Sequence, residues 1–283
     1  MGIPTEWYVP VAQASEKAGF GHLALSDHVF YPQELNTKYP YTEDGKPQYD
    51  PRWDFPDPFV TMASIAAVTE HIKMHTAVFI LPLRNPVLLA KQLGTLARLS
   101  EDRVRIGIGV GWMREEFDVI GEAFNTRGRR MDEMIEVMRT LWQGGFVEHH
   151  GDFFDVPLCD MRPAPLRSVP VWVGGHSEVA LRRAARNDGW VGAQYRIAEI
   201  EQHCQTLRGY REELGVADQP YDIVVSALAL PTPDNLERLE AHGVTALTTS
   251  AWIAQGVMTP DSLEHALDLV GSYGEQWITP ARP

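Results

Sequence analysis

The sequence predicts an α/β fold, a (β/α)8 TIM-type barrel whose first strand is truncated or missing. Short β-branched runs alternate with longer amphipathic segments along the 283 residues, which is the pattern of βα units and a parallel sheet. Several of these runs are almost wholly apolar, as expected for strands that are covered on both faces. The length also suits a barrel of ~250 residues. An open doubly wound sheet is the alternative architecture.

Seven strands are expected. The chain opens on a helix, so the strand missing from an eightfold barrel is the first one. Only Met1–Pro4 remains for it, which predicts either a late start of the sequence or a stunted first strand. The expected strands are His22–Ser26, Ile72–Leu81, Val104–Gly109, Val171–Val173, Trp190–Ala193, Asp222–Ala229 and Ala246–Thr249.

Eight helices are expected between these strands, and several have clear end signals. Asn85 caps a helix that has Pro86 in its first turn. Gly19 can close the first helix in a left-handed conformation. The last helix is expected to start at Thr259 or Asp261. The others are expected at Pro10–Ala18, Pro58–Thr69, Pro86–Leu99, Arg129–Trp142, Glu178–Asn187, Ile197–Leu214 and Asn235–His242.

We expect a single domain over residues 1–283, with insertions at about 29–57 and 144–169. Both segments exceed the ~2–6 residues of an ordinary α/β connection. The first is rich in Tyr, Trp, Pro and Asp and follows the carboxyl end of a strand, where barrels carry function. We expect it to form a mobile cover over the mouth of the barrel. The second predicts a hairpin that turns at Gly151-Asp152.

The composition excludes several classes of protein. With 25 Lys and Arg against 38 Asp and Glu, the net charge of −13 disfavours a nucleic-acid partner. Cys159 and Cys204 are too far apart for a Cys-x-x-Cys motif and too few for a disulfide scaffold. No secretion signal is evident, and no run approaches the ~18 apolar residues of a membrane span. We expect a cytoplasmic protein without a membrane partner.

Asp27 and His28 carry the strongest local signal of a site. They follow a predicted strand directly, so both should lie at the carboxyl-terminal mouth of the barrel, where active sites of this fold gather. Histidine titrates near neutrality and can pass a proton, and Asp27 could orient it or accept from a ligand. The alternative is an aspartate that caps a helix beside a structural histidine.

Two glycine-rich segments also end predicted strands. Gly107–Gly111 lacks the next glycine of a dinucleotide fingerprint, but its glycines let a flat ring approach the backbone. We assign Trp112, which follows them, to substrate contact. Gly174, Gly175 and His176 lead into a helix whose free N–H groups can bind phosphate, with Arg127 as a further partner. The alternative is a tight turn.

No metal site is expected. His71 and His75 lie four residues apart on a predicted strand, which does not reproduce the helical geometry of a zinc motif. Glu148–His150 is expected on the surface of the hairpin. A Gly-x-Ser-x-Gly elbow and a phosphate-binding P-loop are both absent from the sequence, which disfavours hydrolase and NTPase functions.

Several motifs then follow one another in a characteristic order. They are Ser26-Asp27-His28-Val29, Tyr39-Pro40-Tyr41 with Asp44-Gly45, Phe55-Pro56-Asp57-Pro58, Ile80-Leu81-Pro82-Leu83-Arg84-Asn85-Pro86, Gly107-Ile108-Gly109-Val110-Gly111-Trp112 with Glu115-Glu116-Phe117, and Asp188-Gly189-Trp190. Their order resembles the luciferase-like monooxygenase superfamily, and most closely its branch of F420-dependent oxidoreductases. The similarity extends from about Ala14 to Ala193. Members of this family normally begin with a strand, so the missing first strand is a departure.

The resemblance implies positions for the cofactor. Asp27 and His28 would lie beside its ring, and Val78, Phe79 and Ile80 under the ring as a backbone bulge with a cis peptide between Val78 and Phe79. Val110 and Gly111 would line the ring or side chain, and Gly174, Gly175 and His176 the phosphate. Several F420 enzymes carry an acid where Trp112 stands here, so no acid is expected from that position.

The resemblance implies an F420-dependent oxidoreductase that transfers a hydride between the deazaflavin and an organic substrate, with His28 moving the accompanying proton. An FMN-dependent luciferase-like monooxygenase and a non-catalytic flavin- or F420-binding protein are the alternatives, and a metal-dependent hydrolase is the least supported. F420 has an acidic tail, which Arg84, Arg127 or Arg129 could offset. We also expect a homodimer, because family members commonly associate and an unclosed sheet would expose strand edges.

Overall fold

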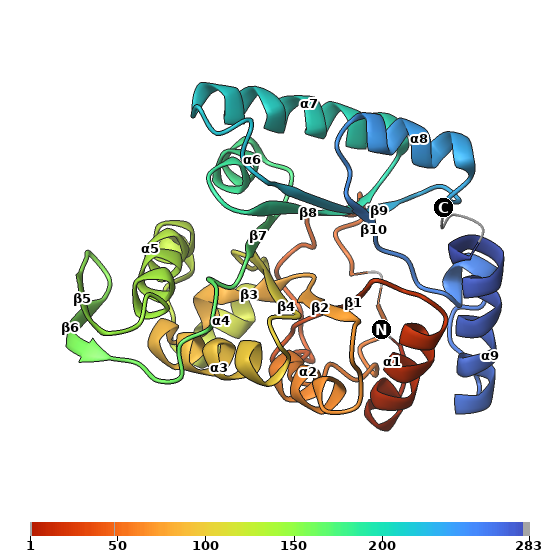
Figure 1. Ribbon diagram of the computed structural model, residues 1–283, viewed down its shortest axis with the longest axis horizontal. Helices are drawn as coiled ribbons and strands as arrows, with labels where there is room; N and C mark the ends of the chain where they lie inside the picture. The colour runs from red at the N-terminus through yellow and green to blue at the C-terminus, as the bar shows by residue number, and fades with distance from the viewer. Residues whose placement is uncertain (1, 48, 280–283) are drawn as a thin grey trace.

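The computed structural model describes residues 2–47 and 49–279. Its main sheet is parallel and curls into a half-barrel, which confirms the predicted fold class (Figure 1). Within the described residues, the chain has no strand before His22. The two strands at the ends of the sheet, His22–Leu25 and Ala246–Leu247, are not paired with each other. The order is β1 (His22–Leu25), β2 (Lys73–Thr76), β4 (Val104–Gly109), β7 (Val171–Gly174), β8 (Gly189–Tyr195), β9 (Asp222–Ala227) and β10 (Ala246–Leu247), with β3 (Phe79–Ile80) beside β4.

Helices cover the outside of the half-barrel on both sides in Figure 1, with α1 to α3 along one half of the sheet and α6 to α8 along the other. The helices are α1 (Tyr8–Lys17), α2 (Pro58–Ala66), α3 (Pro86–Leu99), α4 (Arg114–Ile120), α5 (Arg127–Leu141), α6 (Glu178–Ala185), α7 (Ile197–Glu213), α8 (Pro233–Ala241) and α9 (Leu263–Tyr273). Short 3-10 turns lie at Thr5–Trp7, Leu81–Leu83, Phe124–Thr126 and Ile253–Gln255, and a π-helical turn at Gly274–Ile278.

Helix caps account for most of the predicted helix starts. Asn85 accepts hydrogen bonds from the N–H groups of Val87 and Leu88, so α3 has the predicted bounds. The prediction for the last helix was wrong. α9 begins at Leu263, because the hydroxyl of Ser262 accepts from the N–H of His265 at 3.1 Å and caps it there. The short helix α4 was not predicted at all.

The segment predicted as one strand over Ile72–Leu81 is interrupted in the structure. β2 ends at Thr76, whose hydroxyl donates to the carbonyl of Gly107 at 2.7 Å, and β3 resumes at Phe79. The cis peptide joins Ala77 and Val78, so the expected cis bond between Val78 and Phe79 was placed one residue too late. Phe79 is already paired with Ile108 of β4, so the irregular peptide lies before it.

The predicted hairpin is confirmed. β5 (Phe146–His150) and β6 (Asp155–Asp160) form an antiparallel pair that stands apart from the main sheet. Glu133 of α5 holds its turn, because the carboxylate accepts from the backbone N–H groups of Phe153 and Phe154 at 2.7 to 3.0 Å. The hairpin is therefore tied to the barrel at its tip through one helix.

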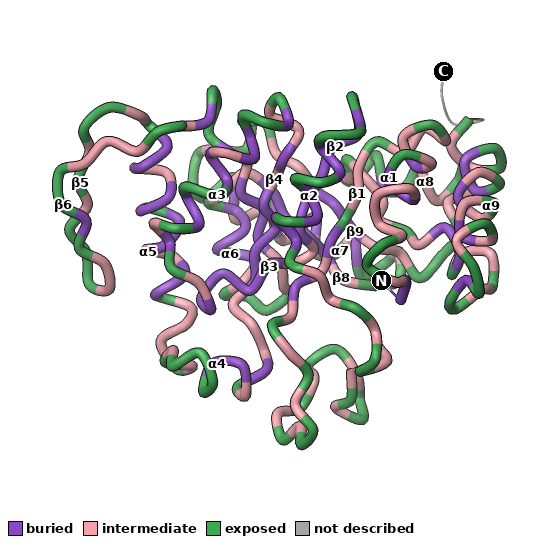
Figure 2. Tube along the Cα trace, turned by 90° about the horizontal axis from the view of Figure 1, so that it is seen from below, coloured by how far each residue is buried: buried purple, intermediate pink, exposed green. Residues whose placement is uncertain are grey.

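The core lies between the curled sheet and the inner faces of the helices, and buried residues gather at the centre of the molecule (Figure 2). A second apolar cluster joins α9 to α1 and includes Ile3, Val11, Trp252, Val270 and Tyr273. Side-chain packing between helices therefore links the last helix to the first. Among the described residues, no helix is both long and apolar enough to cross a membrane.

Two histidines lie in the half-barrel away from its mouth. His22 on β1 and His75 on β2 have ring centroids 5.7 Å apart, and Trp172 of β7 lies 5.1 Å from His75. Nδ1 of His22 and both ring nitrogens of His75 find no hydrogen-bond partner in the described part of the chain. Burial, helped by the charge of Arg105, lowers the pKa of His22 to about 4 and that of His75 to about 3.

These histidines predict a loss of stability in acid. The unfolded chain protonates its histidines near pH 6.5, whereas the folded protein keeps both neutral to a lower pH, so the unfolded state binds more protons in between. The free energy of unfolding should therefore fall as the pH falls from about 6.5 to about 4. Urea unfolding at several pH values measures it. His75→Phe should flatten this dependence, whereas the exposed His71→Gln should not. Equal slopes in both variants would contradict the assignment.

Candidate active site

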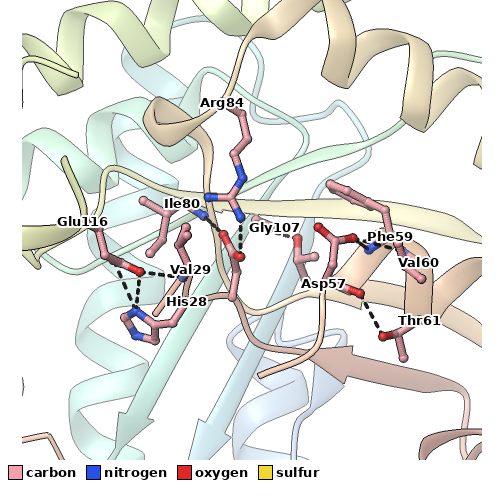
Figure 3. A network of polar contacts seen from close by, with 12 residues as sticks. His28, Val29, Asp57, Phe59, Val60, Thr61, Ile80, Arg84, Gly107 and Glu116 are labelled. Carbon is pink, nitrogen blue, oxygen red and sulfur yellow. Dashed lines mark hydrogen bonds and ion pairs between the residues drawn. The ribbon is translucent and has the colours of Figure 1, made fainter. Parts of the chain in front are cut away.

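Asp27 links the end of β1 to the segment after β2. It is 5% exposed, and its carboxylate accepts from the N–H of Ile80 at 2.9 Å and from Nη2 of Arg84 at 2.6 Å. Ile80 and Arg84 lie near each other in Figure 3. Burial raises the pKa of Asp27, while Arg84 and the Ile80 N–H act in the opposite direction. Asp27 thereby fixes the backbone at Ile80 next to the end of β1, which His28 follows.

His28 lies beside a wholly buried carboxylate. Its Nδ1 is 3.2 and 3.3 Å from the two carboxylate oxygens of Glu116, which also accepts from the N–H of Val29 at 2.7 Å (Figure 3). A carboxylate at this distance places the ring proton on Nδ1 and leaves Nε2 free to exchange a proton. Nε2 lies 3.3 Å from the hydroxyl of Tyr49. The geometry is that of an oriented acid-base histidine.

Glu116 was missed by the sequence reasoning, which looked for an acid only at the position of Trp112. Glu116 stands four residues later on α4, and this helix turns it back toward His28. Its neighbour Glu115 accepts from the N–H groups of Asn36 and Thr37 at 2.8 and 3.0 Å. The Glu115-Glu116-Phe117 motif was the available signal. A buried glutamate needs a hydrogen-bonding or charged partner, and Glu116 finds His28 and the N–H of Val29.

The segment 29–57 contains no helix or strand in its described part, and its aromatic rings lie over the site. Three of its tyrosines each contact a different predicted site residue. The ring centroids are 5.4 Å apart for Tyr49 and His28, 5.1 Å for Tyr39 and Trp112, and 5.3 Å for Tyr41 and His176. The three tyrosines therefore form an aromatic layer over the residues that follow β1, β4 and β7.

The predicted bulge keeps most of its side chains inside the protein. Phe79 and Ile80 are 1% and 4% exposed. Val78 packs between two strands, since a Cβ at Gly109 or at Gly174 would lie 2.7 Å from its methyl groups. Val78 thus fills the space beside Gly109 that a flat ring was expected to use. These two glycines are needed to let the bulge approach β4 and β7.

The start of α6 is a glycine turn followed by a helix cap, and a phosphate site here stays a prediction. Gly175 has a φ of +103°, which favours glycine, and Ser177 caps the helix by accepting from the N–H of Ala180 at 3.3 Å. His176 is exposed, and its Nδ1 lies 3.1 Å from the hydroxyl of Tyr195. Helix cap and glycine turn are both present here, so the two interpretations of this segment do not exclude each other.

Val110, Gly111 and Arg127 lie together at the end of β4. Nε of Arg127 donates to the carbonyl of Gly111 at 3.1 Å, and its guanidinium stacks 3.7 Å from the centre of the Phe124 ring. Gly111 has a φ of +79°, and Val110 packs partly against the main core. Arg127 thus braces the turn after β4 and makes no hydrogen bond to Gly174, Gly175 or His176 within the described residues.

The ion pair of Asp27 predicts a large stability effect. Asp27→Ala should lower the free energy of unfolding by about 3 kcal/mol, because it leaves the guanidinium of Arg84 and the Ile80 N–H without their partner. Chemical denaturation measures this. Asp50→Ala is the matched control, since Asp50 pairs with an arginine, Arg52, that is 87% exposed, and its effect on stability should be much smaller than that of Asp27→Ala. Similar losses in the two variants would refute the structural role of Asp27.

Comparison with known proteins places this geometry in context. The model of the luciferase-like monooxygenase family matches residues 7–274. An uncharacterised protein of Mycobacterium tuberculosis is 41% identical over 239 residues, which are 84% of this chain and 83% of the relative. The F420-dependent glucose-6-phosphate dehydrogenase of Tsukamurella paurometabola is 30% identical over 189 residues, covering 65% of this chain and 52% of the enzyme.

Two further comparisons cover the fold and a second cofactor. The FMNH2-dependent dimethylsulfone monooxygenase of Pseudomonas fluorescens is 34% identical over 130 residues, 45% of this chain and 35% of the enzyme. The F420-dependent tetrahydromethanopterin reductase of Methanopyrus kandleri has the same fold, with a TM-score of 0.73 at 15% identity over 99% of this chain and 97% of the reductase. On the extent of the family match, the chain belongs to the luciferase-like monooxygenase family.

Proposed function

We propose that the protein is an F420-dependent oxidoreductase that transfers a hydride between the deazaflavin and an organic substrate. The observation that carries the proposal is the pair of His28 and Glu116 at the mouth of the half-barrel. Glu116 holds Nδ1 of His28, so Nε2 is the nitrogen that exchanges a proton. When bound, the cofactor supplies the hydride chemistry, and the protein supplies orientation and the proton.

The chain's own residues divide the remaining work. Asp27 and Arg84 fix the backbone of Ile80, on which a ring can rest. Tyr49 covers His28, since its ring lies on the imidazole and its hydroxyl lies 3.3 Å from Nε2. Release or uptake of a proton at Nε2 then balances the charge that a hydride brings to or removes from the substrate.

The residues fit a cofactor of this class. Nη1 of Arg84 is buried and has no hydrogen-bond partner within the described residues, so it is a donor that a ligand can satisfy. Gly175 and His176 form the turn directly before α6, where the helix N-terminus can attract a phosphate. Ala77 and Val78 are partly exposed and are the part of the bulge that a ligand could contact, because Phe79 and Ile80 are buried.

F420 is preferred to FMN on two grounds. A relative named as F420-dependent aligns over more of this chain than the relative named as FMNH2-dependent, and an F420-dependent reductase has the same fold over nearly the whole length. The acidic tail of F420 argues against this choice, because the tail needs cationic partners. Arg84 already pairs with Asp27, and Arg127 already donates to backbone carbonyls. An FMN-dependent monooxygenase therefore remains the alternative, and a non-catalytic binding protein would show no turnover.

His28→Ala should lower turnover by roughly 10²-fold or more, because general acid-base catalysis typically contributes that much. Cofactor affinity should stay within several-fold, since the protein holds the cofactor mainly elsewhere. Steady-state kinetics and cofactor titration measure the two effects. The exposed His71→Ala is the control. A His28 variant with wild-type turnover on an identified substrate would exclude a proton role for this residue.

Titration of cofactor-free protein decides the cofactor. We expect micromolar binding of F420 that weakens from low to moderate salt, because its tail is anionic, and about tenfold weaker binding of FMN. Absorption of the bound cofactor follows the titration. The reverse order of affinities would favour the monooxygenase.

The aromatic segment 29–57 should respond to the cofactor. Its backbone lacks regular hydrogen bonding, so its amide hydrogens should exchange fast in the free protein and slowly in the complex. Hydrogen exchange with mass spectrometry measures this. Glu115→Ala removes the bonds to Asn36 and Thr37 and should speed exchange around these residues in both states. Equal protection with and without cofactor would make the segment a fixed wall.

A further inference from the structure

Tyr49 occupies the nitrogen of His28 that the proposed reaction needs. Its hydroxyl lies 3.3 Å from Nε2, and the two ring centroids are 5.4 Å apart. The rings of Phe55 and Trp112 stand edge-on against the same imidazole, at 5.4 and 6.0 Å. The side chain of His28 is only 13% exposed. A substrate can therefore reach Nε2 only if it displaces Tyr49 or acts through the Tyr49 hydroxyl.

The carboxylate of Glu116 determines which group donates in these hydrogen bonds. An ionised carboxylate only accepts, so Nδ1 of His28 donates to it at 3.2 Å, next to the N–H of Val29 at 2.7 Å. A neutral imidazole that carries its proton on Nδ1 has an acceptor at Nε2. Burial and the nearby charge of Glu116 raise the pKa of Tyr49, so its hydroxyl stays protonated and donates to Nε2.

The three side chains form one chain of hydrogen bonds that leads from the interior toward the mouth. Glu116 on α4 is 0% exposed, whereas His28 and Tyr49 are both partly exposed. Tyr49 belongs to the segment 29–57 that lies over the site, and its ring packs on that of Phe55 at 5.2 Å. Tyr49 is therefore the member of the chain that lies nearest to an incoming substrate.

We propose that Tyr49 is the catalytic group that exchanges a proton with the substrate, and that His28 and Glu116 act behind it as a proton relay. The proposal rests on the proposed function, and it adds a residue that the proposed function does not use for catalysis. Tyrosine can serve as a general acid or base where a neighbouring group takes up or returns its proton. His28 is that neighbour, because Nε2 already accepts from the Tyr49 hydroxyl.

The relay accounts for every proton and electron of an alcohol oxidation. The carbon–hydrogen bond of the alcohol breaks, and its electron pair passes as hydride to the oxidised cofactor. The alcohol hydroxyl loses its proton to the Tyr49 oxygen, while the original Tyr49 proton moves to Nε2. The imidazolium formed is stabilised by Glu116, 3.2 Å away, and later loses its proton to solvent. Reduction of the carbonyl product follows the same steps in reverse.

The alternative role for Tyr49 is structural, as an anchor that holds the segment 29–57 on His28. Tyr49→Phe separates the two roles, because it keeps the ring that packs on Phe55 and removes only the hydroxyl. Tyr31→Phe is the matched control. Tyr31 lies in the same segment with its ring 6.1 Å from that of Tyr49, and its hydroxyl makes no hydrogen bond to His28 in the described part of the chain.

Single-turnover kinetics tests the relay in the holoenzyme. A series of secondary alcohols is mixed with the F420-loaded protein, and the corresponding ketones with the protein that holds reduced F420, and cofactor absorption follows the hydride step. Tyr49→Phe should slow this step by roughly 10²-fold or more, while cofactor affinity stays near wild type. In mixtures of light and heavy water, the wild-type rate should depend on the deuterium fraction along a curve, because two protons move together. The rate of Tyr49→Phe should follow a straight line.

Nuclear magnetic resonance of ¹⁵N-labelled histidine tests the hydrogen bond without any substrate. The signals of His28 are identified by their loss in His28→Gln. We expect Nδ1 to carry the proton and Nε2 to carry none. In Tyr49→Phe the Nε2 resonance should move toward that of an imidazole nitrogen without a donor, and in Tyr31→Phe it should stay in place.

The outcomes separate this proposal from the proposed function. If Tyr49→Phe keeps the wild-type hydride rate while His28→Ala loses it, the relay through Tyr49 is refuted and the F420-dependent activity stands. The relay is also refuted if the Nε2 resonance is the same in Tyr49→Phe and wild type, or if both show the same dependence on deuterium. If no member of the series is turned over with F420 or with FMN, both proposals fall.

Discussion

The buried carboxylate of Asp27 holds the site together. It joins the end of β1 to Ile80 and Arg84, which follow β2 along the chain, and its position in sequence directly before His28 means that the histidine is placed by the same contact. A buried charge tolerates only a geometry in which it is fully paired. The backbone at Ile80 and the position of the residues that follow β1 are both constrained by this pairing.

Much of the fold could be predicted because local signals and the global structure agree. β4 and α3 have the bounds expected from an apolar run and from the Asn85-Pro86 cap. The errors arise where tertiary contacts decide. Pairing of Phe79 with Ile108 determines where the strand after β2 resumes, and no local pattern reveals that. The helix α4 was missed because its seven residues are too few to show a periodicity.

The candidate site also contains residues whose location could be predicted from sequence and a residue whose location could not. The location of Asp27, His28 and Gly174–His176 after the carboxyl ends of strands could be predicted, because such residues gather at one end of a barrel. Glu116 could not, since it lies on a helix and meets its partner, His28, only through the fold. Their separation of 88 residues in sequence exceeds any spacing rule for a motif.

The two adjacent glutamates of α4 hold both the segment over the site and the ring of His28. Glu115 holds the backbone at Asn36 and Thr37, while Glu116 holds His28 and the N–H of Val29, where the aromatic segment begins. Both sets of hydrogen bonds come from one short helix. The segment 29–57 and the side chain of Glu116, which orients His28, are therefore held by the same element. The backbone of the segment and the ring of His28 are therefore held by neighbouring side chains of the same helix, so a displacement of one would also disturb the other.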